Sequence, residues 1–507
     1  MSFVERLVKN ASLSVVAGVG SAVGSLVAAA VVGRTLGVSG TASVAMSLWI
    51  IFLVLTVADI GVTASLARFM PETAREGAPQ LRTFVWDRFK FLLGAIGLGL
   101  LLCGLILLFY WPDMLAKYAA SRSEAYALSA VIALCCVVHM LFAFSYQYLR
   151  GLADFRQIAA FSIVGTLVQI AGVLAGSLWF GVVGALAGYM LASVPMLWVL
   201  LRLRPSGEPV GENKRAAVRR YAWTSYAASL MSPLLWVRAD LLIVDQIADT
   251  HAVGLFAAAS AFAALLLQAC LMVCNALLPS ILHASAEQPA SFERTCRATT
   301  RFGIFVLLPI CFIGAALAPR VIGFIYGGEF EGAGASASLL AIAAGASAIT
   351  LVLTGVLNAA HANLPLARSG GVGAVLTVVL GILFVSRFGL VGAALGRVGA
   401  QSVVAMLTVI AANREVSGVV EKGWFSRILG TSAVAGVAAW LAAVGPGLVG
   451  VLTGGMAGVV TFAVLTLLTL RFVEGDRREL LQAVAGRGPR VRRAARLLLG
   501  EAGGRDG

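Results

Sequence analysis

The sequence predicts an all-α membrane protein with about fourteen transmembrane helices, and three observations support this prediction. Of the 507 residues, 60% are hydrophobic and only 12% are charged, whereas a soluble domain carries about 25% charged residues. The apolar residues gather in blocks of roughly 20, which is the length that crosses a bilayer as a helix. The short alternating segments typical of a membrane β-barrel do not appear.

The first apolar block begins close to the N-terminus. Arg6 and Lys9 precede it, and it runs over residues 11–33. The apolar part of a signal peptide spans about 7–15 residues and leads to a small-residue cleavage site. This block is longer and no soluble domain follows it, so it is predicted to be an uncleaved first transmembrane helix.

The remaining blocks follow in a regular order. The first six helices are predicted at residues 11–33, 42–67, 90–111, 125–149, 157–179 and 182–202. The next six are predicted at residues 220–243, 252–278, 300–318, 334–357, 365–386 and 389–411, and two more at 426–444 and 447–470. The predicted domains are an N-terminal six-helix lobe (1–203), a cytoplasmic linker (204–220), a C-terminal six-helix lobe (221–412), two additional helices (413–470) and a basic cytoplasmic tail (471–507).

The basic residues determine the predicted orientation. When the connections are assigned alternately to the two sides of the membrane, 31 of the 38 Lys and Arg residues fall on the side of the N-terminus and 5 on the other side. The remaining two, Arg238 and Arg397, lie within predicted helices. Cytoplasmic connections carry the excess of positive charge, so both termini are predicted to be cytoplasmic. The net charge of +14 is thereby explained without nucleic acid.

An internal repeat relates the two predicted lobes. Residues 180–188 read FGVVGALAG and residues 388–396 read FGLVGAALG, with six identities in nine positions at an offset of 208 residues. The same offset places Pro71 on Pro279 and Gly165 on Gly373. The copies are six helices apart and so have the same orientation, which is typical of a parallel repeat in transporters.

The sequence offers no site for a reaction. The predicted connections are short, and the longest, about 20 residues, lie on the cytoplasmic side. They contain no paired carboxylates, no HExxH motif and no Ser/His arrangement, so no catalytic residue, metal site or cofactor is predicted. Six of the seven cysteines lie inside apolar blocks without a CxxC pair, which favours packing over disulfide or metal chemistry.

Three charged residues within predicted helices are candidate cargo-binding groups. Charges at membrane depth are costly and usually face a cavity or a partner. Arg238, Asp240 and Arg397 all belong to the second predicted lobe, and Arg397 lies about 12 Å from the external end of its helix. Guanidinium groups bind phosphate oxygens bidentately. Alternatively, Arg238 pairs with Asp240 or Asp245, and Arg397 caps a backbone carbonyl.

Two further residues are candidates for coupling transport to H⁺ or Na⁺. Asp59 lies in the second predicted helix and His139 near the middle of the fourth. A carboxylate or imidazole at this depth can take up and release an ion. Both are equally explained by helix-to-helix hydrogen bonds.

Two other segments have distinctive patterns. The seventh predicted helix is unusually polar, and Pro233 is expected to kink it, which suits a cavity wall. The tail alternates arginines with Val491 and Leu497 to Leu499. It is predicted either to bind anionic lipids as an amphipathic segment or to act only as a topology anchor.

Several short motifs resemble the polysaccharide transporter family, the O-antigen and exopolysaccharide flippases. They are GRTLG at residues 33–37, ADIG at 58–61, LARF at 66–69 before Pro71, YLRG at 148–151 before Phe155, RAD at 238–240, VGLF at 253–256 and YG at 326–327. The resemblance covers about residues 1–411. The external turn at residues 38–42 departs from the family pattern.

This resemblance implies a fold shared with multidrug exporters and lipid II flippases, with two six-helix lobes working by alternating access. It implies transport of an undecaprenyl-pyrophosphate-linked oligosaccharide from the cytoplasmic to the periplasmic leaflet, for surface polysaccharide biosynthesis beside a polysaccharide polymerase or chain-length regulator. Two alternatives stay open. One is an ion-coupled drug/cation antiporter, which the arginines disfavour. The other is a membrane-embedded enzyme of polysaccharide assembly.

Overall fold

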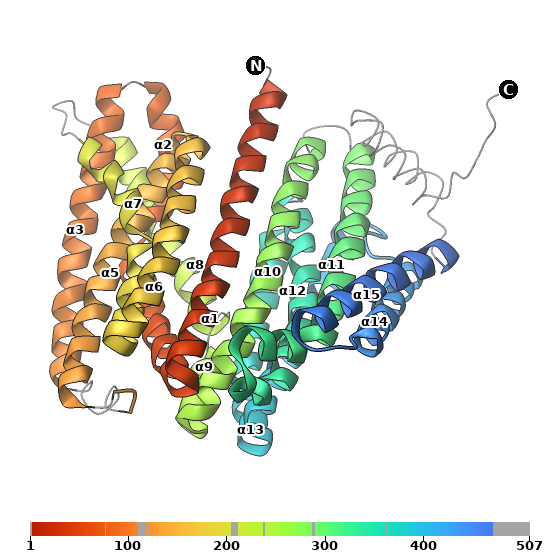
Figure 1. Cartoon of the computed structure of the whole chain (residues 1–507). Helices are drawn as coiled ribbons and strands as arrows, with labels where there is room; N and C mark the ends of the chain where they lie inside the picture. The colour runs from red at the N-terminus through yellow and green to blue at the C-terminus, as the bar shows by residue number, and fades with distance from the viewer. Residues whose placement is uncertain are drawn as a thin grey trace. The chain divides into compact units, whose positions relative to one another are not determined.

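The structure, a computed structural model, is built entirely from helices in the part of the chain that it describes (Figure 1). The structure describes residues 3–76, 78–109, 117–119, 121–203, 211–236, 239–285, 289–360 and 362–469. It describes their side chains except those of residues 3–17, 19, 74–76, 78, 101–109, 227–236, 276, 278–280, 282–285, 289–290, 363 and 467–469. The predicted basic tail therefore lies outside the described residues.

The helices follow the order of the predicted apolar blocks. The first seven are α1 (Phe3–Ala58), α2 (Val62–Glu76), α3 (Ala78–Phe109), α5 (Arg122–Gly151), α6 (Phe155–Leu191), α7 (Val194–Leu197) and the 3₁₀ helix η1 (Trp198–Arg202). The next six are α8 (Glu212–Trp236), α9 (Ala239–Ile247), α10 (Thr250–Ser285), α11 (Pro289–Tyr326), the 3₁₀ helix η2 (Gly328–Ala333) and α12 (Gly334–Ala359). The last three are α13 (Asn363–Glu415), α14 (Lys422–Ala442) and α15 (Gly447–Thr469).

The all-helical membrane architecture is confirmed. In the described residues, nine helices are long and apolar enough to cross a bilayer. Three of these helices each contain two predicted segments, which meet at a glycine with a positive φ. The glycine is Gly37 in α1, Gly181 in α6 and Gly389 in α13. Nine helices therefore hold twelve of the fourteen predicted segments. The other two segments belong to α3 and to the pair α8 and α9.

The predicted cytoplasmic connections are more helical than expected. The segment 68–90 belongs to α2 and α3, α8 begins at Glu212 inside the predicted linker, and α10 and α11 extend toward each other over the predicted connection 279–299. Ala, Leu, Glu and Arg are strong helix formers, and a continued helix satisfies backbone groups that an earlier end would leave unpaired. The sequence pattern marked the apolar part of each helix and missed its polar extension.

Three predicted helices are each divided among two or more helices of the structure. One of them, 182–202, comprises the end of α6, the short helix α7 and η1. The predicted helix 42–67 breaks between α1 and α2, where Ile60 has φ 41° and Gly61 has φ 72°. The predicted helix 220–243 is divided between α8 and α9. Pro233, the expected cause of a kink, lies in α8 among residues whose side chains fall outside the described set.

The structure reproduces the internal repeat in its backbone angles. Gly181 has φ 60° and ψ −137°, and Gly389, 208 residues later, has φ 54° and ψ −131°. A methyl group on Gly184 would overlap the carbonyl oxygen of Gly176, and one on Gly392 would overlap that of Phe384. Phe384 and Gly392 lie 208 residues after Gly176 and Gly184. Both copies of the repeat therefore form the same tight helical hairpin.

We expect Gly389→Ala to destabilise the protein by about 1–3 kcal/mol, because this backbone conformation is nearly restricted to glycine. No other atom lies within 4 Å of the added methyl group, so the loss comes from the backbone alone. Thermal unfolding in detergent measures it. The matched control is Gly371→Ala, at a helical position of α13 with equally open surroundings, where no loss is expected. Equal melting temperatures for both variants would contradict the assignment.

The chain forms two compact units, each made of segments that are distant in the sequence. One unit comprises Met1–Gln268, Ile325–Ala333 and Gly373–Arg397, and the other comprises Ala269–Phe324, Gly334–Val372 and Val398–Gly507. These two units are groups of residues in close contact and do not correspond to the two predicted lobes. The bounds of the lobes stay a prediction.

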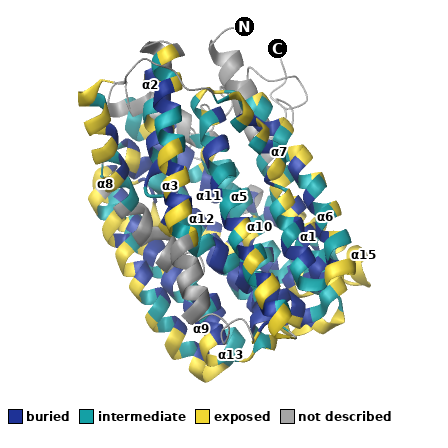
Figure 2. Cartoon of the chain, turned by 90° about the vertical axis from the view of Figure 1, so that its left-hand side faces the viewer, coloured by how far each residue is buried: buried dark blue, intermediate teal, exposed yellow. Residues whose placement is uncertain are grey.

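Each unit has its own apolar core. In the first unit, α1, α5 and α6 pack around Ile50, Leu128 and Leu186. In the second, α11 and α12 pack around Ile304 and Leu353, together with the end of α13 and the start of α14. Many large apolar residues of both units are exposed, and Figure 2 shows exposed residues along many of the helices. Such extensive apolar exposure is expected of a surface that faces lipid.

Candidate functional site

The short helix α9 carries two buried carboxylates, Asp240 and Asp245. They are five residues apart, so they point about 140° away from each other around the helix axis. A buried charge is stable only when it is paired. Each carboxylate therefore requires its own cation, and the structure provides two different ones.

Asp240 pairs with Arg397, which brings together two of the three predicted cargo-binding residues. Arg397 Nη1 lies 2.6 Å from Asp240 Oδ2, with 6% of the Asp240 side chain and 20% of the Arg397 side chain exposed. The carboxylate stands in the first turn of α9, where the helix dipole favours a negative charge. Arg397 thus contacts the Asp240 carboxylate.

Close packing holds the two helices of this pair together. A methyl group on Gly381 of α13 would lie 2.8 Å from Ile243 Cδ1 of α9. Glycine therefore lets α9 lie against α13 near the ion pair. The third predicted cargo-binding residue, Arg238, lies outside the described residues, and its role stays a prediction.

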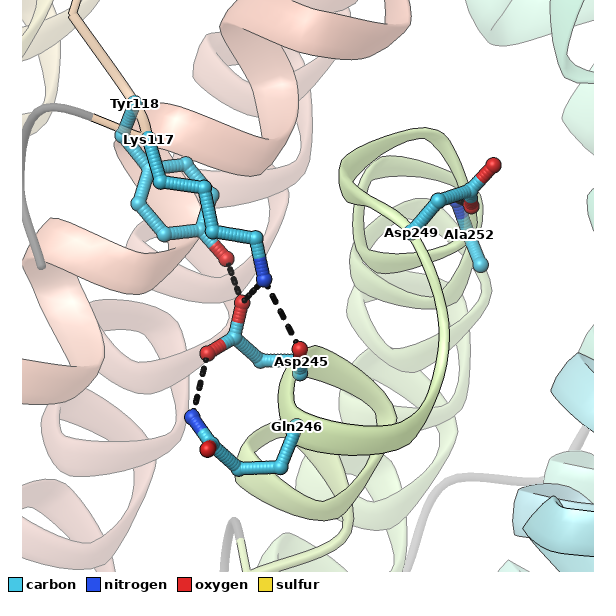
Figure 3. A network of polar contacts seen from close by, with 6 residues as sticks. All are labelled: Lys117, Tyr118, Asp245, Gln246, Asp249 and Ala252. Atoms are coloured by element: carbon cyan, nitrogen blue, oxygen red, sulfur yellow. Dashed lines mark hydrogen bonds and ion pairs between the residues drawn. The ribbon is translucent and has the colours of Figure 1, made fainter.

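Asp245 lies at the centre of a second polar network (Figure 3). Lys117 Nζ donates to Asp245 Oδ1 at 2.7 Å and to the Asp245 carbonyl oxygen at 2.8 Å. The Tyr118 hydroxyl donates to the same Oδ1, and Gln246 Nε2 donates to Oδ2 at 2.9 Å. Only 2% of the Asp245 side chain is exposed. Both carboxylate oxygens are therefore satisfied although almost no water reaches them.

The chain on both sides of this network is fixed by further hydrogen bonds. Ser43 Oγ of α1 donates to the Tyr118 carbonyl oxygen at 3.0 Å. Asp249 Oδ1 accepts from the Ala252 backbone N–H at 2.8 Å and so caps the start of α10. Burial, together with the adjacent Asp245 carboxylate, raises the pKa of the Tyr118 phenol. The phenol therefore keeps its proton and acts as the donor.

This network joins residues of the two predicted lobes on the side predicted to be external. Lys117 belongs to the first predicted lobe and Asp245 to the second. Two more contacts join residues of the two predicted lobes. Arg34 Nε donates to the Ile325 carbonyl oxygen at 2.7 Å, and Gly254 of α10 packs directly on the Val38 carbonyl. All of these residues belong to one compact unit.

The Asp245 network has only indirect signals in the sequence. The sequence offers Asp245 only as a possible partner of Arg238, and it places Lys117 among the five basic residues on the predicted external side. A lysine on a side that is otherwise poor in positive charge was the available signal. Its partner, 128 residues away, could not be identified from sequence spacing.

Asp59 occupies the break between α1 and α2, and its predicted position inside a continuous helix is wrong. Its carboxylate accepts from the Thr63 backbone N–H at 3.2 Å and from Thr63 Oγ1 at 2.9 Å. Gly61 packs against the Ala222 backbone of α8. The Tyr226 hydroxyl of α8 donates to the Val57 carbonyl oxygen at 2.6 Å. Asp59 thus caps α2 where α8 crosses, and ion coupling there stays a prediction.

His139 is half-buried in α5, and its Nδ1 lies 2.9 Å from the Cys135 carbonyl oxygen of the same helix. This is an internal helix contact, and ion coupling by His139 also stays a prediction. Across the described part of the chain, no three His, Cys, Asp or Glu residues gather as they would to hold a metal ion.

Comparisons with known proteins give one matching family model. The model of the family described as "Polysaccharide biosynthesis protein" matches residues 7–284. No curated protein sequence matches the chain.

Several solved structures are similar in fold. One is described as "Lipid II flippase MurJ, inward closed conformation" and has a TM-score of 0.68 at 15% identity, covering 89% of this chain and 97% of that one. An inward-facing multidrug resistance MATE family transporter of the MOP superfamily has a TM-score of 0.61 at 15% identity, covering 79% and 95%. A MOP superfamily transporter from Pyrococcus furiosus has a TM-score of 0.56 at 15% identity, covering 82% and 96%.

Proposed function

The chain belongs to the polysaccharide biosynthesis protein family, and from this premise we propose that it is a flippase for a lipid-linked oligosaccharide. Its fold is that of the MOP superfamily transporters, and it acts as a transporter. The proposed cargo is an undecaprenyl-pyrophosphate-linked oligosaccharide. It moves from the cytoplasmic to the periplasmic leaflet of a bacterial inner membrane for surface polysaccharide biosynthesis.

The observation that carries this proposal is the pair of Arg397 and Asp240. The guanidinium lies within a predicted transmembrane segment, and one fifth of its side chain remains exposed. A pyrophosphate offers the same bidentate acceptor geometry as a carboxylate. An incoming pyrophosphate can therefore take the place of Asp240 on Arg397, while Asp240 keeps the site neutral when no cargo is bound.

The Asp245 network supports alternating access. It links the two predicted lobes through Lys117, and 40% of that lysine side chain is exposed. An ion pair with one partly exposed partner is weaker than a fully buried pair, because water and salt screen it. In the proposed cycle it holds the predicted external side closed while cargo enters from the other side. It separates when the external side opens.

Transport by the purified protein tests the proposal. In reconstituted vesicles carrying a fluorescent undecaprenyl-pyrophosphate oligosaccharide, we expect the protein to raise the fraction that a membrane-impermeant quencher reaches with time. The Arg397→Ala variant at equal protein density is expected to give the rate of protein-free vesicles. Efflux of a lipophilic cationic dye, with no movement of the labelled lipid, would instead establish the drug/cation antiporter.

A further inference from the structure

A small basic pocket lies in the first compact unit, away from both networks of α9. Its volume is about 230 Å³, and it lies between α3, α5 and the end of η1. The lining residues are Leu81, Arg82, Val85, Trp86, Tyr148, Arg202 and Leu203. Two arginines, a tryptophan and a tyrosine thus line a pocket whose other lining residues are aliphatic.

The two arginines make the pocket suitable for an anion. Among the described residues, no acidic side chain is part of its lining. Arg202 is held in place because its Nη1 donates to Gln157 Oε1 at 3.0 Å, while Gln157 Nε2 donates to Asp154 Oδ2 at 2.6 Å. This bond uses one N–H of a guanidinium that has five donors. The remaining donors, with those of Arg82, suit the oxygens of a phosphate.

The size of the pocket limits what it can hold. Sites for drug-sized ligands occupy about 300–1,000 Å³, and this pocket is smaller. An oligosaccharide does not fit in it, whereas a single phosphate with its ester groups does. Because the pocket is too small for an oligosaccharide, it is a different site from the cargo site proposed at Arg397.

The surroundings of the pocket favour a lipid over an anion dissolved in water. The helix η1, which ends at Arg202, exposes Trp198 by 60% and Leu201 by 72%. In a 3₁₀ helix, residues three apart lie on the same face, so these two side chains form one apolar strip. Trp86 and Tyr148 are of the residue types that gather at the level of the headgroups. Both arginines lie on the side predicted to be cytoplasmic.

We propose that this pocket binds the phosphate headgroup of an anionic phospholipid of the cytoplasmic leaflet, with the acyl chains along the exposed strip of Trp198 and Leu201. The site is independent of the cargo, so it holds whether or not the proposed function is correct. A bound headgroup would join α3, α5 and the end of η1 through charge-assisted hydrogen bonds.

Native mass spectrometry of the full chain tests this proposal, with phosphatidylglycerol, phosphatidylcholine, undecaprenyl phosphate and inorganic phosphate added separately. We expect phosphatidylglycerol to be retained preferentially, and Arg82→Gln or Arg202→Gln each to weaken its binding about tenfold. Arg82→Gln leaves the bond from Arg202 to Gln157 intact, so it separates loss of the site from loss of fold. Arg150→Gln, at an exposed arginine of α5 outside the pocket, is the matched control.

Three results would overturn the proposal. Equal retention of phosphatidylcholine would show that the pocket does not select an anion. Inorganic phosphate competing as well as phosphatidylglycerol would show a site for a free anion. Retention of undecaprenyl phosphate alone, lost in Arg82→Gln, would make the pocket part of the cargo path.

Discussion

Replacing Arg397 with Ala is expected to abolish export of surface polysaccharide. The change removes the proposed cargo-binding group and leaves Asp240, which is 6% exposed, as an unpaired buried charge. Breaking a buried pair from one side costs about 3–5 kcal/mol, so part of the effect is on stability. Export in cells, measured beside the amount of protein in the membrane, gives the first comparison. Arg387→Ala, at an exposed position of the same helix, is expected to export normally.

The double variant Asp240→Asn with Arg397→Gln separates the two effects. Removing both charges leaves no unpaired ion, so the free energy of unfolding is expected to recover toward that of the native protein. Export is expected to stay absent, because the guanidinium is still missing. A double variant that is stable and also exports would assign Arg397 to structure alone and would end the proposal that it binds the pyrophosphate.

Replacing Asp245 with Asn is expected to open the predicted external side and to reduce export at least tenfold. The amide cannot form the ion pair with Lys117, and it offers one acceptor oxygen where the carboxylate offers two. Hydrogen exchange is expected to increase at residues 117–119 and 240–247. Residues 428–439 of α14, which belong to the other unit, serve as the internal reference and are expected to exchange as before.

A charge exchange tests whether attraction between the two residues is what matters. Lys117→Asp and Asp245→Lys alone each place like charges together, and each is expected to lose export. Combined, they restore opposite charges and are expected to recover part of it, with a coupling free energy of about 0.5–3 kcal/mol. Purely additive losses would exclude a direct role for the pair in the closed state.

Much of the fold followed from local pattern. Blocks of about 20 apolar residues can satisfy their backbone in lipid only as helices, and each of the fourteen predicted blocks lies mostly in helices where the structure describes it. The repeat of FGxVGAxxG was readable because the hairpin turn requires glycine at residues 181 and 389 and close packing requires it at 184 and 392. Steric demands of this kind leave a trace in the sequence.

Other features of the fold could not be predicted from the local sequence. The break at residues 59–61 depends on α8, whose Ala222 and Tyr226 pack against it. Local propensity alone favoured one continuous helix there. The polar ends of α3, α8 and α11 fall in segments that the sequence predicts to be connections, because a hydrophobicity pattern ends where charged residues begin.

The sequence alone determined that this chain is a membrane protein and in which order its helices follow. It also identified the charged residues that lie within predicted transmembrane helices. Apolar length, glycine sterics and charge asymmetry act locally, so each can be read from neighbouring residues. Only the tertiary structure decided which charges meet. Asp240 reaches Arg397 across 157 residues and Asp245 reaches Lys117 across 128. A buried ion pair requires proximity in space, and proximity is fixed by how the helices pack.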